Sequence, residues 1–324
     1  MNTYFNNIIC QATGASSIYE MEEIQSLWSG YGKILRIGLV DSKYKSVVVK
    51  YIQSDEVNRH PRGWDTDFSH QRKVKSYEVE SEWYLNWSFR CDDSCRIPVC
   101  FAVESFENEV LIVLEDLNET QFCETRVAAS KAEIQACLNW LAGFHARFMK
   151  EDPGNLWEQG TYWHLNTRPE ELAKMLHSPL KESAFLIDEK LFQSYFKTII
   201  HGDAKLANFC FTKDGYTAAA VDFQYVGGGC GMKDVAYFLG SCLTEDECAM
   251  SVPIYLDFYF RALAQNLDND KFHFPDVEKE WRELFPFAWA DFHRFLKGWS
   301  PSHWKINDYS ERITREVVES FEQK

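Results

Sequence analysis

The stretch HGDAKLANF at residues 201–209, followed by VDFQ at 221–224, decides how this sequence is interpreted. Asp203 stands five residues before Asn208, and Asp222 ends an apolar run. Phosphoryl transfer needs such groups, because one carboxylate must orient the attacking hydroxyl while carboxylate and amide oxygens hold Mg²⁺ against a triphosphate. An Asp–Asn pair can also simply stabilise a turn. The second Asp, at a distance that allows a hairpin, favours the catalytic interpretation.

Lys205 follows the proposed base by two residues. An ammonium group at this point could offset the charge on a phosphoryl group during its transfer. We therefore include Lys205 with Asp203 among the expected catalytic residues.

The composition is that of a globular protein and excludes several function classes. The chain has 324 residues, 45% of them hydrophobic and 26% charged, which argues against disordered and fibrous proteins. Its 34 Lys and Arg against 49 Asp and Glu give a net charge of −15, so nucleic acid and anionic membrane surfaces are not expected as partners. The N-terminus lacks a basic start before an apolar run, and we expect a cytoplasmic protein whose ten cysteines are free thiols.

The first third of the sequence reads as strand, strand, strand, helix, strand, strand. Apolar and β-branched runs mark the clearest strands, and a turn at Glu107–Asn108 separates the last two. A helical pattern passes through Tyr77, Trp83 and Trp87. The runs that predict strands are 33–40, 46–52, 101–105 and 110–115.

Helices dominate from about residue 118. Apolar residues recur at spacings of three and four from Ile134 to Phe148, and helical patterns resume from Asp234 to the end. A short strand pair is expected between them, at 199–211 and 218–223. The sequence thus predicts a β-rich N-terminal lobe over residues 1–117, a mainly helical C-terminal lobe over residues 118–324, and a cleft at their junction.

These motifs resemble the kinase-fold phosphotransferases of the aminoglycoside phosphotransferase and choline kinase type, particularly the ecdysteroid kinase-like branch. The resemblance runs in order along nearly the whole chain. It implies an α+β, protein-kinase-like fold with a small β-rich N-lobe and a larger helical C-lobe. It also implies that Asp203 is the catalytic base and that Asn208 and Asp222 bind Mg²⁺.

The same resemblance implies roles for residues outside the central motif. Lys50, in VVVK, corresponds to the strand lysine that holds the α- and β-phosphates of ATP, and Glu80 corresponds to the helix glutamate that pairs with it. Glu115 and Leu117 fall in the segment LEDL, which resembles the hinge whose backbone meets adenine. Asp234 corresponds to the buried aspartate that braces the catalytic loop.

Each of these residues also has a simpler interpretation. Lys50 shares a strand face with apolar neighbours, so it either extends past a sheet edge to solvent or pairs with an acid. Glu80 has Glu78 and Glu82 beside it, and only the resemblance selects it. Asp234 could be the N-cap of a helix, a role that does not exclude bracing.

Glycines mark two further segments. In Ser29-Gly30-Tyr31-Gly32, Gly30 and Gly32 would let backbone N–H groups approach phosphate, although an ordinary hairpin turn is the alternative. The segment lacks a full GxGxxG pattern. The run 227–229 is three glycines, which we expect to be flexible enough to let substrate in.

The segment after Asp222 favours a small acceptor over a peptide. Only eleven residues, four of them glycine, separate Asp222 from Asp234, and no APE string follows. The acceptor is expected beside the aromatic C-terminal region, with 298–304 as the best candidate wall. Aromatic rings suit a choline-like cation and equally a flat apolar alcohol, and the acidic net charge slightly favours the cation. His145 and His164 are interpreted as structural.

The function expected from the sequence is phosphorylation of a hydroxyl of a small molecule with ATP and Mg²⁺. A catalytically silent kinase-fold protein that binds a nucleotide or small molecule is the alternative. Its usual mark is loss of the strand lysine, the base or a metal ligand, and this sequence keeps all of them. The short segment before Asp234 disfavours a peptide kinase.

Overall fold

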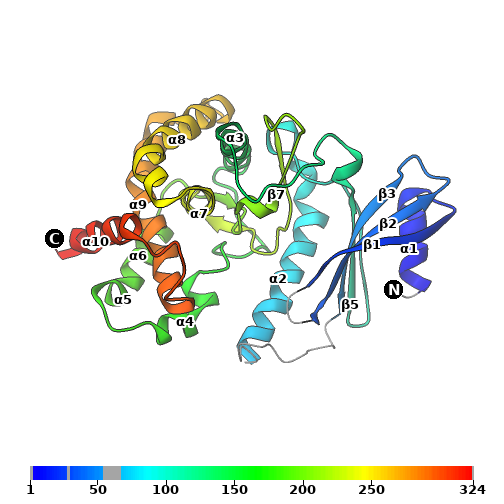
Figure 1. The fold of residues 1–324 in the computed structure, drawn as a ribbon, viewed down its shortest axis with the longest axis horizontal. Coiled ribbons are helices and arrows are strands. Elements are labelled where there is room, and N and C mark those ends of the chain that lie inside the picture. The colour runs from blue at the N-terminus through cyan, green and yellow to red at the C-terminus, as the bar shows by residue number, and fades with distance from the viewer. Residues whose placement is uncertain (1–2, 28–29, 54–66, 323–324) are drawn as a thin grey trace.

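The computed structural model describes residues 3–27, 30–53 and 67–322, and it confirms the α+β, kinase-like fold (Figure 1). A five-stranded sheet forms one lobe, and helices form most of the other. The elements of the first lobe are α1 (Thr3–Thr13), β1 (Ser17–Ser26), β2 (Gly32–Val40), β3 (Ser46–Gln53), α2 (Asp67–Asn86), η2 (Ser88–Arg90), η3 (Asp93–Cys95), β4 (Cys100–Phe106) and β5 (Glu109–Glu115).

The sheet is antiparallel throughout, with the strand order β1-β2-β3-β5-β4. Its two faces belong to different cores because side chains alternate along each strand. On the outer face, Phe5 and Ile9 of α1 pack against residues such as Val49. On the inner face, α2 packs through Trp83 and its neighbours against residues such as Ile112. The inner face is the one turned toward the helical lobe (Figure 1).

The second lobe is built around α3 and a pair of short hairpin-like sheets. A capping box between Ser130 and Glu133 starts α3, which packs against α8, while α7 and α10 pack against α9. Its elements are η4 (Leu117–Glu119), α3 (Lys131–Arg147), η5 (Leu165–Thr167), α4 (Pro169–Lys174), α5 (Pro179–Glu182), α6 (Ala184–Phe192), β6 (Thr198–Ile200), η6 (Leu206–Asn208), β7 (Phe209–Phe211), β8 (Ala218–Ala220), β9 (Gly227–Gly229), α7 (Met232–Cys242), α8 (Glu245–Asn266), α9 (Phe274–Trp299) and α10 (Asp308–Glu322).

The structure corrects two sequence predictions in this lobe. The expected strand at 199–211 is interrupted, because residues 201–208 form a loop and the turn η6 between β6 and β7. The glycine run 227–229 is not a flexible flap but the strand β9, which pairs with β6. A Cβ on Gly227 would collide with the Trp157 carbonyl oxygen, so glycine serves close packing here.

Two further observations concern the whole described chain. All ten cysteines fall within it and are free thiols. None of the helices in the described residues is both long enough and apolar enough to cross a membrane.

Candidate active site

A buried carboxylate shapes the loop that carries the HGD motif. Asp234 accepts hydrogen bonds from the backbone N–H groups of His201 at 2.6 Å and Gly202 at 2.9 Å. His145 lies against the same carboxylate, 3.2 Å away through Nε2. Asp234 is the third residue of α7 and Gly231 is the N-cap, so the N-cap interpretation of Asp234 is wrong. Its contacts instead fix the backbone just before Asp203.

Two structural constraints require glycine at position 202. Its φ of +79° lies in the left-handed region that favours glycine. A Cβ there would also collide with the Tyr225 carbonyl oxygen and lie 2.8 Å from the Thr161 backbone nitrogen. The motif therefore reads HGD because a larger residue does not fit between these two backbone segments.

Three donors converge on the buried carboxylate of Asp203. Oδ2 accepts from Lys205 Nζ at 2.8 Å and from Asn208 Nδ2 at 3.0 Å. Oδ1 accepts from the Tyr237 hydroxyl at 3.1 Å, across from α7. Burial works against the charge of Lys205, but the carboxylates of Asp203 and Asp222 outweigh it and raise the pKa of that lysine. The carboxylate is thus held in one orientation by charged and neutral donors together.

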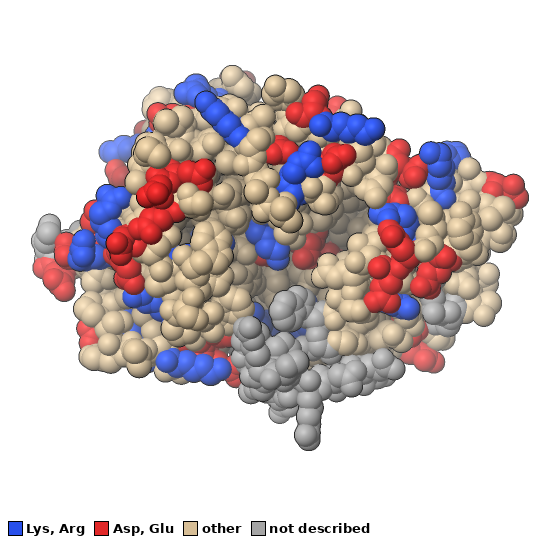
Figure 2. Space-filling view, in the orientation of Figure 1, with Lys and Arg blue, Asp and Glu red and all other residues tan. Residues whose placement is uncertain are grey.

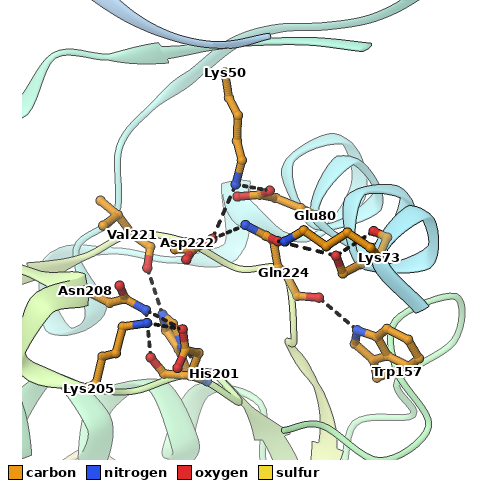
Figure 3. Close-up of polar contacts among 12 residues, drawn as sticks. Lys50, Lys73, Glu80, Trp157, His201, Lys205, Asn208, Val221, Asp222 and Gln224 are labelled. Atoms are coloured by element: carbon orange, nitrogen blue, oxygen red, sulfur yellow. Dashed lines mark hydrogen bonds and ion pairs between the residues drawn. The ribbon is translucent and has the colours of Figure 1, made fainter. Parts of the chain in front are cut away.

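Asp222 lies between β8 and β9 and has an unusual backbone. Its φ is +70°, a conformation that is uncommon outside glycine and often marks functional sites. Its Oδ1 accepts from Gln224 Nε2 at 2.6 Å and from Lys50 Nζ at 3.3 Å (Figure 3). Burial favours the neutral acid, but the ammonium groups of Lys50, Lys205 and Lys73 hold the pKa of Asp222 well below its usual range.

Lys50 connects the sheet to α2 through Glu80, and it connects the sheet lobe to the helical lobe through Asp222. Lys50 Nζ lies 2.6 Å from Glu80 Oε2, and both side chains are buried. The same Nζ reaches Asp222 in the other lobe (Figure 3). Although burial lowers the pKa of Lys50, the two carboxylates outweigh it and raise the pKa above its ordinary value. Of the three candidates, the structure brings Glu80, and neither Glu78 nor Glu82, to this lysine.

The donor set fits a magnesium ion. Asn208 directs its Nδ2 to the backbone and side chain of Asp203, and this leaves Oδ1 with no hydrogen-bond partner among the described residues. Asp222 uses Oδ1 for Lys50 and Gln224, and its Oδ2 likewise has no partner within that part of the chain. A backbone hydrogen bond of 3.0 Å from Val221 to Asn208 holds the two segments together. One carboxylate oxygen and one amide oxygen suit Mg²⁺, which takes few protein ligands and retains water.

Sequence reasoning missed Gln224 and Lys73, which extend this network. Gln224 Oε1 accepts from Lys73 Nζ at 2.6 Å and from Ser76 Oγ at 3.3 Å, both on α2. With its carbonyl oxygen held by α2, the amide turns its NH₂ group toward Asp222 (Figure 3). Lys73 lies seven residues before Glu80, so it is on the same face of the helix. That spacing was the available signal, but the many other charged and polar residues of α2 obscured it.

The predicted glycine loop forms the turn between β1 and β2. Gly30 has a φ of +79°, and its N–H donates to the Leu27 carbonyl at 3.2 Å. Gly32 has a φ of +131°, and a Cβ there would collide with the Tyr51 carbonyl oxygen. Ser29 lies outside the described residues. Gly32 is therefore closely packed against β3, and a role for Gly30 and Gly32 in binding phosphate stays a prediction.

The predicted hinge begins within the last residues of β5, which ends at Glu115. The Glu115 side chain pairs with Arg96 and accepts from the Val99 backbone N–H at 3.0 Å, and Leu117 is buried. Asp116 accepts from Ser46 Oγ at 2.6 Å. These side chains are thus engaged within the protein, and a role for the backbone of the segment in binding adenine stays a prediction.

The aromatic C-terminal region is mostly core, as expected. Trp299 ends α9, and a Cβ on Gly298 would collide with the Glu171 carbonyl oxygen, so that glycine allows α4 and α9 to pack closely. Trp304 is 59% exposed. His145 and His164 are buried, in keeping with structural roles.

A hollow separates the two lobes on the face seen in Figure 2, and charged atoms of both signs lie along its sides. A separate open cavity of about 710 Å³ lies between α8 and α10 and contains none of the residues above. The site residues expected from the sequence thus lie at the junction of the lobes and not in this cavity.

Comparison with one solved structure supports the fold, and two weaker similarities are also found. The chain superposes on a microcompartment-associated aminopropanol kinase with a TM-score of 0.52 and 12% identity, over 97% of this chain and 94% of that one. An aminoglycoside-3'-phosphotransferase of type VIII gives a TM-score of 0.49 and 13% identity, over 86% of this chain and 100% of that one. Plasmodium vivax ethanolamine kinase gives a TM-score of 0.49 and 11% identity, over 93% of this chain and 81% of that one. No curated protein matches the sequence.

Residues 161–272 match the sequence model of the ecdysteroid kinase-like family. This segment contains the HGD loop, Asn208, Asp222 and Asp234. The resemblance to the aminoglycoside phosphotransferase and choline kinase-like superfamily, and to its ecdysteroid kinase-like branch, is therefore confirmed.

Proposed function

We propose that this protein is an ATP- and Mg²⁺-dependent phosphotransferase that phosphorylates a hydroxyl group of a small molecule. One observation carries the proposal. At the junction of the lobes, Asn208 and Asp222 each keep one oxygen without a partner among the described residues, beside the fixed carboxylate of Asp203 and the paired ammonium of Lys50. Metal-assisted phosphoryl transfer requires these groups together: oxygen ligands for the metal, a carboxylate for the hydroxyl and a cation for the phosphates.

Asp203 would orient the acceptor hydroxyl in line with the γ-phosphate. Its Oδ2 takes two donors, whereas its Oδ1 takes only Tyr237 among the described residues and keeps a lone pair for the hydroxyl proton. Lys205 would offset charge on the phosphoryl group as it leaves ATP. Most of the rate enhancement would come from positioning and from fixed charges, as is general for phosphoryl transfer.

The nucleotide would lie between the lobes. Lys50, held by Glu80, would contact the α- and β-phosphates, and the backbone of Glu115 to Leu117 would meet adenine. Asn208 and Asp222 would hold the metal, which when bound neutralises charge on the triphosphate. The β1–β2 turn with Gly30 and Gly32 would cover the phosphates.

The acceptor would be a small hydroxylated molecule. The segment between Asp222 and Asp234 is short, and β9 within it is packed against β6, which supports a site without a platform for a peptide. We propose a cytoplasmic location, where ATP is supplied and free thiols stay reduced.

Release of ADP by purified protein tests the proposal. The assay uses Mg-ATP with pooled aminoglycosides, amino alcohols, sugars and sterol-like alcohols, and a parallel titration measures nucleotide binding. We expect acceptor-dependent ADP release from the wild type. Asp203→Asn should lower it by at least ~10³-fold, while the Kd of Mg-ATP stays the same because Asp203 does not hold the nucleotide.

Two outcomes would count against this account. Unchanged turnover in Asp203→Asn would remove Asp203 from the reaction. Binding of nucleotide without turnover, for any acceptor and in the wild type, would favour the silent binding protein that the sequence left as the alternative.

A further inference from the structure

The loop between α9 and α10 places an ammonium group among three aromatic rings. Lys305 Nζ lies 5.2 Å from the ring centroid of Tyr237, 5.3 Å from that of Phe292 and 5.5 Å from that of Trp304. All three distances are within the range of cation–π attraction. We call these three rings the aromatic box. A hydrogen bond of 3.2 Å from the Lys305 backbone N–H to His303 Nδ1 fixes the loop locally.

The aromatic box shares a side chain with the proposed base. The Tyr237 ring forms one wall, and its hydroxyl donates to Asp203 Oδ1, the oxygen that would take the acceptor proton. The charges of Asp203 and Lys205 both influence the pKa of Lys305, in opposite directions. The box therefore lies beside the oxygen of the base that would take the acceptor proton.

Within the described residues, the ammonium in the box forms no ion pair with a carboxylate: Asp203 pairs with Lys205, and Glu311 pairs with Lys297. Burial is the main reason that its pKa falls to about 8, since the carboxylate of Asp203 compensates only in part. Near neutral pH the group remains mostly charged, with the three rings within the range of cation–π attraction.

The space that adjoins the box on the α9 side is small. A cavity lined by Phe292, Trp304 and Lys305, but not by Tyr237, has a volume of about 20 Å³, which is room for about one water molecule. An acceptor bearing an ammonium group would therefore meet a like charge at the three rings, where the Lys305 ammonium already lies.

We propose that Lys305 determines acceptor specificity: its own ammonium occupies the aromatic box beside Asp203, so that the protein selects hydroxylated acceptors without a cationic group. This inference rests on the proposed phosphotransferase function. It replaces the slight preference for a cation that the net charge suggested, because the charge next to the base is positive. Specificity of this kind comes from a repulsive element as much as from an attractive one.

Chemical rescue tests the filled box directly. Lys305→Ala removes three carbons and the ammonium nitrogen, and n-propylammonium carries these same atoms. Binding of n-propylammonium, choline and 1-propanol is measured by calorimetry at constant ionic strength, without nucleotide. Lys297→Ala is the matched control, since it removes a nearby lysine that pairs with Glu311. Thermal unfolding establishes that each variant is folded, and Lys305→Arg serves as a second variant that keeps the charge.

The wild type, Lys297→Ala and Lys305→Arg should bind none of the three compounds. Lys305→Ala should bind n-propylammonium at least ~10-fold more tightly than 1-propanol, and Trp304→Ala added to it should weaken that binding. Equal binding of n-propylammonium or choline by the wild type and Lys305→Ala would overturn the proposal. So would a Lys305→Ala protein that does not distinguish n-propylammonium from 1-propanol.

A turnover measurement completes the test. We expect wild-type ADP release with neutral or anionic acceptors and not with choline, ethanolamine or aminoglycosides. A wild type that turns over these cationic acceptors with the higher kcat/KM would refute the specificity claim while leaving the phosphotransferase intact. Failure to bind Mg-ATP would instead contradict the proposed function, and the calorimetric result would still decide whether Lys305 fills the box.

Discussion

At the scale of single residues, Tyr237 links the proposed base to the acceptor side. Its hydroxyl is the one donor to Asp203 Oδ1 among the described residues. Loss of a hydrogen bond to a charged group costs about 1.5–3 kcal/mol. We predict that Tyr237→Phe lowers kcat by roughly 10- to 100-fold and leaves the Kd of Mg-ATP unchanged.

Steady-state kinetics and calorimetry check this prediction together. Tyr216→Phe is the control, because Tyr216 is 70% exposed and none of the described contacts joins its hydroxyl to Asp203. Equal loss of activity in both variants, or a kcat of Tyr237→Phe equal to that of the wild type, would show that this hydroxyl does not orient Asp203.

The sequence predicts Asp203, Lys205, Asn208 and Asp222 as candidate site residues, because they lie close together in one short stretch of the chain. It could not supply Tyr237, Lys73 or Lys305. Each of these reaches the site from an element distant in sequence, and no short motif records such an approach. Glu80 is intermediate, since the resemblance selected it from three glutamates and the structure pairs it with Lys50.

At the scale of elements, Gly202 allows the HGD loop to pass close to the Tyr225 carbonyl. We predict that Gly202→Ala lowers the free energy of unfolding by ~2–4 kcal/mol, because a methyl group adds a collision to an unfavourable φ. Gly14 has a similar φ of +70°, but a methyl group there would meet no atom within 4 Å. Gly14→Ala should therefore cost only about 1 kcal/mol.

Urea unfolding of the two variants separates the collision from the backbone strain. Equal losses would mean that the φ angle alone accounts for Gly202, and that the approach to Tyr225 can relax.

The helix α2 contributes Lys73 to the metal region through Gln224. We predict that Lys73→Met weakens Mg-ATP binding about 10-fold, because Gln224 loses a charged donor and the triphosphate loses a nearby cation. Lys75→Met is the matched control, since Lys75 is exposed and its nearest acid is Glu78, one turn along the same helix. Calorimetric titration gives both Kd values.

An equal Kd for Lys73→Met and the wild type would exclude this lysine from the site. A loss in Lys75→Met of the same size would point to the general charge of the helix rather than to the contact with Gln224.

The helices and strands also differ in whether a local sequence pattern could predict them. The four predicted strands match β2 to β5 to within one residue at each end, because alternation and β-branched side chains mark them locally. Their predicted ranges are 33–40, 46–52, 101–105 and 110–115. The strand β9 was missed, because three glycines carry no β propensity and pair here only through tertiary packing.

At the scale of the whole molecule, Lys305 makes stability depend on pH. Its folded pKa of about 8 is below the ordinary value of 10.5, so between these values the unfolded chain binds more protons. The contribution of Lys305 to the free energy of unfolding should therefore rise with pH from about 8 to 10.5. Below pH 8 the desolvated ammonium lowers that free energy by its full amount.

We predict that Lys305→Met is more stable than the wild type by ~1–3 kcal/mol near neutral pH, and that this gain shrinks as the pH rises above 8. Thermal unfolding of both proteins at about pH 7 and about pH 9.5 measures the change, because titration of all other groups cancels in the difference. A gain that is independent of pH would mean that the ammonium is not desolvated in the folded protein.

The net charge of −15 gave little information about the site itself. Lys50, Lys73 and Lys205 gather around Asp222 and hold its pKa low, so the site is locally rich in cations within an acidic protein. This contrast suits a cleft that receives a triphosphate.

A crystal structure with Mg²⁺ and a non-hydrolysable ATP analogue tests the central claim most directly. We expect the metal on Asn208 Oδ1 and Asp222 Oδ2, the α- and β-phosphates at Lys50, and the γ-phosphate facing Asp203. A nucleotide bound elsewhere, or a metal that leaves Asn208 and Asp222 without a ligand, would contradict the account.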